Sequence, residues 1–439
     1  MLDFFSFLAE HVVWYLICVS VVLIGLCYLL RRHIFSLIDP LFYFLVINES
    51  FCIADVLFMW HFRMINQSIT LSYVLTETAL FAGVLQFRPR PREEALVPAS
   101  GAGIPRPPLR VLYQISLALF VVLHLLVYTE RGIPVLQDSR LSIYQSTGWG
   151  IVDRVFDVQL VIIVYYLVDL LRFRRWMFAE WMSLLITVTI ELLSGAKIAV
   201  LEIFFIAGLA SYFMGTHRRF FSLRSKSFLV SVLVAVAAAL AVVTIQSQNS
   251  VESGLDLSPV DGLVLRLVGS GDAFVYAYPE NFVTYLDGSH PVKAVLKEYL
   301  AFFRLVPDAN LPTHIGVQLS QHFTGNGSMF QTNAKHNLFG LVYFGFWGSI
   351  VYSYLTGSLI GLVRCTLMKR LPRHWIGGIF FTLMSLGTIS LVNEPDAAHR
   401  YVIDTVIIFI PLVVVASTIA LGLKTRPAAC GLREPEPSA

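Results

Sequence analysis

Long apolar runs constrain this chain more than any other feature. Runs close to 20 apolar residues recur along all 439 residues, and about 20 is the length that a helix needs to cross a bilayer core of roughly 30 Å. Only 14% of the residues are charged, whereas a soluble chain carries about a quarter. The alternation typical of an outer-membrane barrel is absent. The sequence therefore predicts one all-α polytopic membrane domain over residues 1–439.

Eleven apolar runs are long enough to be membrane spans. They lie at 11–30, 34–57, 69–87, 111–128, 151–171, 176–193, 197–214, 227–245, 337–363, 376–392 and 402–423. The first is interpreted as a retained span, because no basic segment with a small-residue cleavage site marks a signal peptide. The second contains Asn48, Glu49 and Asp55, so we expect it to be broken or tilted.

The basic residues orient these spans. If the spans alternate, 21 of the 32 lysines and arginines fall on one side. The positive-inside rule then places the N-terminus outside and the C-terminal tail, 424–439, in the cytoplasm. Two outside segments are long, 129–150 and 246–336. The second, with roughly 90 residues, is too long to lack structure, and we expect a large helical loop with a surface helix over 290–306.

The eleven remaining bases oppose this orientation rule, so each invites a functional explanation. Arg140, Arg266 and Arg304 lie in three separate outside segments. The planar guanidinium group binds phosphate oxygens in pairs and stays charged, so these arginines could converge on a phosphate-rich ligand. Lys197 lies at a turn between two spans and suits either the same ligand or the membrane interface. The alternative for all four is a solvated or snorkelling side chain.

The sharpest local pattern is QTNAKHNLFGLVYFGFWGSI, residues 331–350. A polar turn leads directly into an apolar span, which places His336 at the outer membrane surface. An imidazole there suits a general base near neutral pH. Asn337 would orient it or bind a sugar hydroxyl, and Lys335 precedes the pair. The alternative is an ordinary helix start capped by an asparagine.

The last outside turn, NEPDAAHR at 393–400, gathers Glu394, Asp396, His399 and Arg400. It is interpreted either as a substrate-binding cluster or as an exposed turn. Other chemistry has no support, because the chain lacks a Gly-rich phosphate loop, a nucleophile elbow, a DxD-like pair and an HExxH helix. The five cysteines show no zinc spacing, and none lies in an outside loop. We expect no metal, no cofactor and no structural disulfide.

Four segments together resemble one family. GIPVLQDSR, at the start of 132–150, resembles the first large periplasmic loop of the Wzy-type O-antigen polymerases, which join oligosaccharide repeat units. LLSGAKIAVLEIFFIAGLASYFMGTHRR (192–219) and RLVGSGDAFVYAY (266–278) resemble further parts of that family. KHNLFGLVYFGFWG (335–348) is similar to the His-Asn entry of the related O-antigen ligases. The resemblance covers roughly residues 130–350.

The resemblance implies an inverting GT-C-type glycosyltransferase in the bacterial inner membrane, acting at its periplasmic face. The donor and the acceptor would be glycans on undecaprenyl pyrophosphate; membrane lipids and a chain-length regulator would be partners, and nucleic acid would not. His336 would be the catalytic base. The resemblance and the loop positions together give the remaining expected site residues. Pyrophosphate would bind Arg140, Arg266, Arg304 and Lys197, and substrate would bind Asn337, Asp272, Lys335, Glu394 and Arg400.

One departure and two alternatives accompany this interpretation. Lys197 stands where many relatives have arginine, which weakens its role as a phosphate ligand. A ligase would transfer the glycan to a lipid A core instead, and the His-Asn motif favours that. A transporter or flippase for a lipid-linked sugar is the alternative from another class. It predicts charges deep within spans, whereas the charges here gather mostly outside them.

Overall fold

The computed structural model describes residues 4, 7–8, 10–89, 107–136, 150–172, 177–194, 199–217, 269–307, 310–324 and 332–425. In these ranges every regular element is helical and no strand occurs. The elements, with η for short 3-10 or π segments, are α2 (Val12–Leu30), η1 (Phe42–Asn48), α3 (Glu49–His61), α4 (Gln67–Leu85), α5 (Pro107–Arg131), η2 (Pro134–Leu136), α7 (Gly150–Arg172), α8 (Phe178–Leu193), α9 (Ala199–Met214), η4 (Gly269–Gly271), α13 (Asp272–Ala277), η5 (Pro279–Tyr285), α14 (Pro291–Val295), α15 (Lys297–Phe302), α16 (Ile315–Thr324), α17 (His336–Gly361), η7 (Leu362–Leu367), α18 (Met368–Arg370), α19 (Trp375–Asn393), α20 (Pro395–Ala398), α21 (Arg400–Asp404), η8 (Thr405–Phe409) and α22 (Ile410–Thr425).

Seven helical segments of the described chain are long and apolar enough to cross a membrane. They are Val12–Leu30, Phe42–His61, Gln67–Leu85, Pro107–Leu136, His336–Arg370, Trp375–Asn393 and Arg400–Leu423. Helices α7, α8 and α9 occupy three more of the expected spans, although α8 and α9 have only 16 residues each. The expected span 227–245 lies outside the described residues. The described part of the chain is thus all-helical, and its long apolar helices indicate a multi-pass membrane protein.

The bundle has a buried centre and an apolar rim. Helix α19 lies at the centre, and 78% of its 18-residue apolar stretch is buried. The corresponding value is 17% for α2 and 17% for Arg400–Leu423, the segment that contains α22. The exposed residues of α2 include Ile17, Val21 and Ile24. A continuous apolar face of this kind is unfavourable in water. A lipid bilayer supplies the apolar surroundings that such peripheral helices need.

Glycines bring α4 and α17 into backbone contact. A Cβ at Gly83 would overlap the backbone of Tyr354 and Ser358, and one at Gly357 would overlap the Leu80 carbonyl. Small residues allow helices in a membrane to approach this closely, which increases their van der Waals contact. Helices α4 and α17 therefore form a closely packed pair, and both carry side chains of the candidate site described below.

Helix α17 is broken into a hairpin. Gly345 has φ 67° and ψ −171°, a backbone conformation open in practice only to glycine. The chain turns back there, so that a Cβ at Gly340 would lie 2.9 Å from the Cα of Ser349. His336–Phe344 consequently forms a short half-helix against the longer arm of α17. The sequence predicted one uninterrupted span over 337–363, and the structure corrects this.

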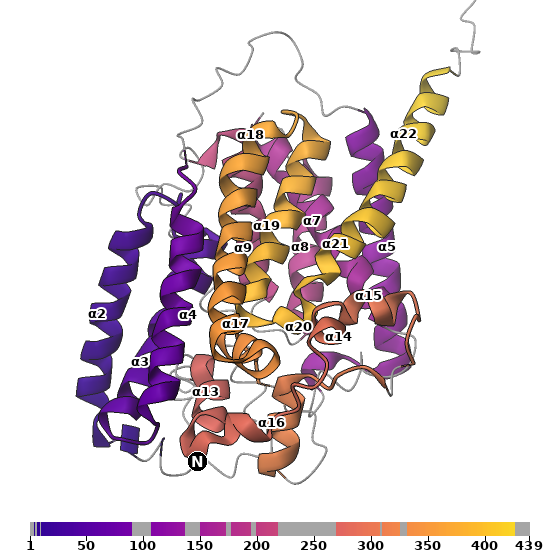
Figure 1. The fold of residues 1–439 in the computed structure, drawn as a ribbon. Helices are drawn as coiled ribbons and strands as arrows, with labels where there is room; N and C mark the ends of the chain where they lie inside the picture. Colours follow the sequence, from indigo (N-terminus) through magenta and orange to yellow (C-terminus); the bar gives the residue numbers. More distant parts are fainter. Residues whose placement is uncertain are drawn as a thin grey trace, which may run out of the picture.

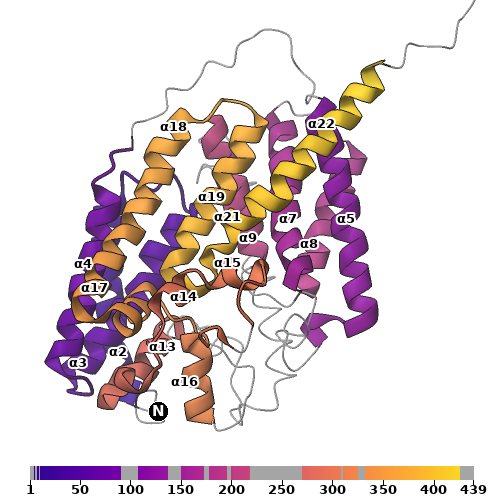
Figure 2. The same cartoon turned by 45° about the vertical axis from the view of Figure 1, so that its right-hand side comes forward.

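Different elements lie at the two ends of the bundle. At the first, which we call the basic end, His33 Nε2 lies 2.8 Å from the Phe87 carbonyl and Arg364 pairs with buried Asp39. Figure 1 shows α18 and the C-terminal end of α22 at this end. Figures 1 and 2 show α13, α14, α15 and α16 at the opposite end, which we call the loop end.

The described part of the long loop is helical, as expected, but its elements are short. One helix was predicted over 290–306, and the structure instead has α14 and α15, interrupted at Leu296. Val292, Leu296 and Phe303, which lie in this predicted helix, are exposed. The chain therefore keeps an apolar surface at the loop end, but on two short helices and a turn.

Candidate active site

The half-helix of α17 begins inside the bundle. Lys335 and His336 have exposed fractions of 1% and 0%, so the expected position of His336 at the membrane surface is wrong. Lys335 takes a left-handed conformation with φ 33°, and its backbone N–H donates to the Asn393 carbonyl over 3.1 Å. The hairpin turn at Gly345 is what directs the residues 335–337 inwards, against α3, α4 and α19.

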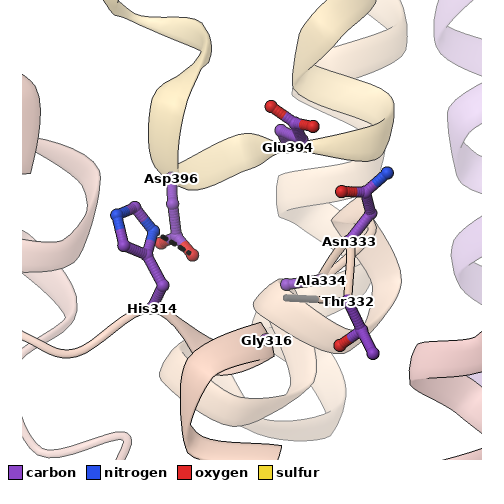
Figure 3. A pocket seen from close by; sticks show the side chains of 7 residues that line it. All are labelled: His314, Gly316, Thr332, Asn333, Ala334, Glu394 and Asp396. Carbon is purple, nitrogen blue, oxygen red and sulfur yellow. Dashed lines mark ion pairs between the residues drawn. The ribbon is translucent and has the colours of Figure 1, made fainter. Parts of the chain in front are cut away.

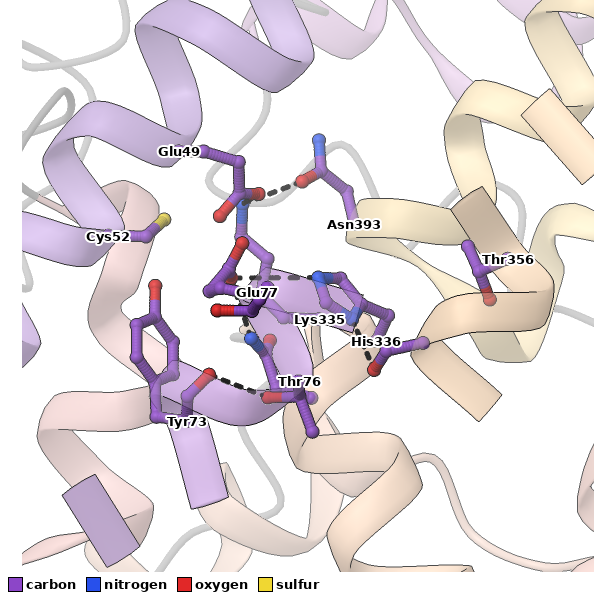
Figure 4. A network of polar contacts seen from close by, with 12 residues as sticks. Glu49, Cys52, Tyr73, Thr76, Glu77, Lys335, His336, Thr356 and Asn393 are labelled. Carbon is purple, nitrogen blue, oxygen red and sulfur yellow. Dashed lines mark hydrogen bonds and ion pairs between the residues drawn. The ribbon is translucent and has the colours of Figure 1, made fainter. Parts of the chain in front are cut away.

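The Lys335 ammonium group is neutralised within the bundle (Figure 4). Its Nζ lies 3.1 Å from Glu49 Oε1 and donates to Asn393 Oδ1 over 2.6 Å. Asn48 Nδ2 donates to the same Asn393 oxygen over 2.9 Å. A buried cation is tolerated only when it is paired and hydrogen-bonded in this way. Lys335 is therefore committed to joining α3, α17 and α19, and it is not a free ligand for substrate.

His336 and Asn337 both face Glu77, in the middle of α4. His336 Nδ1 lies 2.9 Å from Ser353 Oγ, and Nε2 lies 3.6 Å from Glu77 Oε1. Asn337 Nδ2 donates to the same Glu77 oxygen over 2.7 Å. The Ser353 hydroxyl can accept from Nδ1 or donate to it; in the tautomer with the ring proton on Nδ1, Nε2 carries the lone pair. The carboxylate beside it would stabilise the imidazolium ion that forms when Nε2 accepts a proton.

Several buried polar atoms around this pair lack hydrogen bonds. Among the described residues, His336 Nε2, Glu77 Oε2, Glu49 Oε2 and Asn337 Oδ1 have no hydrogen-bond partner. Proteins seldom leave such groups unsatisfied, and the exceptions concentrate where a ligand or water is accommodated. The four atoms belong to α3, α4 and α17, so the unpaired groups come from three helices of the bundle.

Asp272 approaches this region from the loop end. It is the first residue of α13, which packs on α3, and a Cβ at neighbouring Gly271 would overlap the Asp55 carboxylate. Asp55 accepts a 2.7 Å hydrogen bond from the Tyr15 hydroxyl. Burial raises the pKa of Asp272 to about 7, against the opposing effects of the Ala273 amide and Lys335. A carboxyl group with this pKa exchanges protons near neutral pH.

A small polar pocket lies at the loop end beside the half-helix, and we call it the mouth pocket (Figure 3). His314, Gly316, Thr332, Asn333, Glu394 and Asp396 line it. Asp396, with an exposed fraction of 7%, lies 3.2 Å from His314 Nδ1. Glu394 is exposed, so a ligand in the pocket would meet two carboxylate side chains.

A second charged cluster ties α7 to the loop end. Arg154 of α7 pairs with Glu298 of α15 and with buried Asp404 of α21, 3.3 Å away. Arg400 of α21 lies 3.0 Å from Asp157 of α7. Arg400 was expected to bind substrate, and the structure gives it a carboxylate partner on α7. It serves first to join two helices.

The proposed pyrophosphate ligands are described only in part. Arg140, Arg266 and Lys197 lie outside the described residues. Arg304 is exposed, in a left-handed turn with φ 51°. Within the described chain, no group of three or more His, Cys, Asp or Glu side chains is arranged to hold a metal ion.

The structure identifies polar residues of the candidate site that the sequence did not predict. Glu77, Asn393 and His314 are not among the site residues that the sequence predicts. A carboxylate inside an apolar span is costly, and it usually faces a functional partner. Glu77 follows Ser72, Tyr73 and Thr76 in the third span, and that polar surrounding was the available signal. Nothing local in the sequence indicated the contact between His314 and Asp396.

Comparisons of the whole chain with known protein families, with characterised proteins and with solved structures found no match.

Proposed function

We propose that this protein is an inverting glycosyltransferase that takes its glycan from undecaprenyl pyrophosphate. The observation that carries the proposal is the buried pair of His336 and Glu77, in which Nε2 is 3.6 Å from the carboxylate and has no hydrogen-bond partner among the described residues. Glycosyl transfer to a hydroxyl group requires a site that excludes water, because water would otherwise compete as the acceptor. A buried base meets this requirement. The resemblance to the O-antigen polymerases and ligases supports the same chemistry.

The reaction then has a defined balance of bonds and charge. The acceptor oxygen attacks the anomeric carbon, and the bond from that carbon to the pyrophosphate oxygen breaks with both electrons. The acceptor proton passes to His336 Nε2, beside Glu77. One displacement inverts the anomeric centre. Negative charge grows on the pyrophosphate, and cationic groups positioned there would stabilise it; Arg140, Arg266, Arg304 and Lys197 remain the proposed groups.

Within this class, the proposal is the polymerase, which transfers the growing chain to the sugar end of a new lipid-linked repeat unit. The resemblance of residues 132–140 to the polymerase loop favours it over the ligase. The site would face the periplasm, because the loop end lies opposite the basic end. The experiment is direct: purified protein is supplied with the undecaprenyl-pyrophosphate repeat unit alone. Longer lipid-linked products indicate a polymerase, and a requirement for a core acceptor indicates a ligase.

Substitutions at the pair test the assignment of the base. We expect His336→Ala to lower the rate of chain elongation about 10²- to 10⁴-fold, the usual contribution of a general base. Glu77→Gln, which keeps the shape but removes the charge, should cause a smaller loss. Matched controls are His322→Ala and Glu280→Gln, because both side chains are exposed at the loop end. Normal elongation by His336→Ala at equal protein level would remove His336 from the mechanism.

A lipid-linked sugar transporter is the second candidate, and one observation favours it. Glu49, Asp55 and Glu77 lie buried within candidate spans, although most charges of the sequence gather outside the spans. Transporters place such groups on the substrate pathway. An experiment in proteoliposomes distinguishes the two candidates. A transporter moves the lipid-linked repeat unit between leaflets without lengthening it, whereas a polymerase lengthens it.

A further inference from the structure

We propose that residues 291–307, which we call the lipid-contact segment, form a surface that binds the bilayer leaflet at the loop end. Its exposed apolar side chains enter the acyl region of that leaflet, and its bases bind the phosphate groups of anionic phospholipids. This inference goes beyond the proposed function and does not depend on His336 or on any glycan. The evidence is the level of the segment along the last span, its exposed apolar side chains and its charge.

The lipid-contact segment lies where the last candidate span begins (Figure 2). Helices α14 and α15 form most of it, and α15 contacts α20 and α21. Arg154 of α7 pairs with both Glu298 of α15 and Asp404 of α21. Asp404 lies near the start of Arg400–Leu423, a span of 24 residues. That length is about 36 Å of helix, against a hydrocarbon core of roughly 30 Å. The segment is therefore at the level where hydrocarbon gives way to headgroups.

Large apolar side chains of the segment are turned away from the protein. Val292 and Leu296, one helical turn apart, are 69% and 41% exposed, and Phe303 and Leu305 are 54% and 67% exposed. Ala294, between the first two, is 1% exposed, so the opposite side of α14 packs on the bundle. Several exposed apolar side chains in one short segment mark a site of contact with a membrane or a protein. At this level of the bundle the adjoining medium is lipid.

A turn at Arg304 presents the last two of these apolar side chains. Arg304 has φ 51°, and the Leu305 N–H donates to the Leu300 carbonyl over 2.9 Å, which closes the turn. Phe303, Arg304 and Leu305 are consequently all exposed. An arginine between two apolar side chains suits the membrane interface, because its guanidinium group reaches the phosphates while its stem and its neighbours stay among the acyl chains.

The charge of the segment fits an anionic surface. Its bases are Lys293, Lys297 and Arg304, and its one acid is Glu298, which Arg154 neutralises. Within the described residues, neither Lys293 nor Arg304 forms an ion pair with a carboxylate. A base near an anionic membrane surface strengthens binding about fivefold. Phospholipids and lipid-linked pyrophosphates both carry phosphate, and we assign this exposed surface to the phospholipids that surround the protein.

Packing holds the segment in place before any lipid binds. A Cβ at Gly288, just before the segment, would overlap the Val342 carbonyl of the half-helix. Helix α14 contacts both α17 and α20. Binding to lipid therefore does not require the segment to fold first, which keeps the entropy cost of the contact low.

A photocrosslinker tests the contact at a single residue. p-Benzoylphenylalanine is placed at the position of Phe303 in the full-length protein, in nanodiscs of phosphatidylcholine with a minority of phosphatidylglycerol. Irradiation should give lipid adducts, identified by the mass of the modified peptide. The matched control is the same crosslinker at the position of Tyr285, an aromatic side chain at the loop end that is 78% exposed and lies outside the segment. Few or no lipid adducts are expected there.

The masses of the adducts also test the choice of lipid. Phosphatidylglycerol should be enriched over its share of the nanodisc, and Arg304→Gln and Lys293→Gln should each reduce this enrichment about fivefold. Arg63→Gln is the matched control. Arg63 is exposed between α3 and α4 with a similar backbone, φ 59°, but its neighbours Phe62 and Met64 are half-buried. Undecaprenyl pyrophosphate added at the same fraction as phosphatidylglycerol should not replace it in the adducts.

Each outcome decides one part of the proposal. An absence of lipid adducts at Phe303, or equal yields at Phe303 and Tyr285, would overturn the contact with lipid. Enrichment that neither segment variant lowers, or that Arg63→Gln lowers equally, would overturn the recognition of anionic headgroups. Adducts mainly with undecaprenyl pyrophosphate would overturn the assignment to phospholipids. None of these measurements uses elongation, so His336→Ala should give the same adducts whether or not the proposed glycosyltransferase function holds.

Discussion

Gly345 is the single residue on which the buried site most depends. Its φ of 67° and ψ of −171° turn α17 back on itself, and a Cβ there would meet nothing within 4 Å. Alanine would therefore be penalised by backbone strain and not by a clash. We expect Gly345→Ala to destabilise the protein by about 1–3 kcal/mol, seen as a lower unfolding temperature of the purified protein.

The control for this substitution is Gly25→Ala in α2. A Cβ at Gly25 also meets nothing within 4 Å, but the residue lies in a regular helix. Alanine should be neutral or slightly stabilising there. Equal unfolding temperatures for the Gly345→Ala variant and the parent would mean that the hairpin does not require its left-handed turn.

Asp272 gives a prediction about pH. Folding raises its pKa to about 7, from the value near 4 of an exposed aspartate. Between about pH 4 and 7 the folded state keeps a proton that the unfolded chain has released. The contribution of this group to stability is therefore full below pH 4 and is lost as the pH rises through 7.

Asp272→Asn isolates that contribution, because asparagine does not ionise. The unfolding temperature of the variant relative to the parent should rise between pH 5 and pH 8. The opposite trend, with the parent gaining on the variant as the pH rises, would show an ionised Asp272 that is stabilised by a cation.

At the scale of elements, the pairing of α4 with α17 sets the distance between Glu77 and His336. Gly83 and Gly357 bring the two backbones together. A larger residue at Gly357 would push α17 away at its longer arm and misplace the half-helix. We expect Gly357→Ala to cost about 1–3 kcal/mol of stability, the usual penalty of overpacking. It should also lower the rate of chain elongation per folded molecule.

Gly422→Ala in α22 is the matched control, since a Cβ there meets nothing within 4 Å. The readouts are unfolding temperature and elongation rate per folded molecule. Unaltered values for the Gly357→Ala variant would show that the two helices can separate without affecting the site.

The whole molecule is expected to lie across the membrane with its basic end in the cytoplasm. Tyr285, with an exposed fraction of 78%, marks the loop end, and exposed Arg373 marks the basic end. A membrane-impermeant maleimide should label Tyr285→Cys in spheroplasts with an intact inner membrane, and Arg373→Cys only after lysis. The parent chain controls for labelling of its own cysteines. The reverse pattern would invert the topology and move the site away from the periplasm.

The class of the protein followed from the sequence alone. Apolar runs of helical length and the grouping of bases are local, additive properties, so they predicted an all-helical multi-pass chain with two different ends. The same local signals identified His336, Asn337 and the acidic turn at 393–400 as unusual. The number of spans stays a prediction, because charged α7 and the short α8 and α9 depart from the length and hydropathy pattern that seven described segments meet.

The tertiary structure decided what those residues contact. Lys335 and Glu49 are 286 positions apart, and His336 and Glu77 are on different helices, so no local pattern could pair them. The backbone conformation of Gly345 folds α17 back on itself, and His336 is buried inside the bundle instead of lying at the membrane surface that the sequence predicted. Ion pairing likewise gave Arg400 a partner, Asp157, that the sequence did not indicate. Sequence determined which polar groups had to be compensated in an apolar chain, and packing alone determined which group compensates which, because pairing depends on distances that only the folded bundle sets.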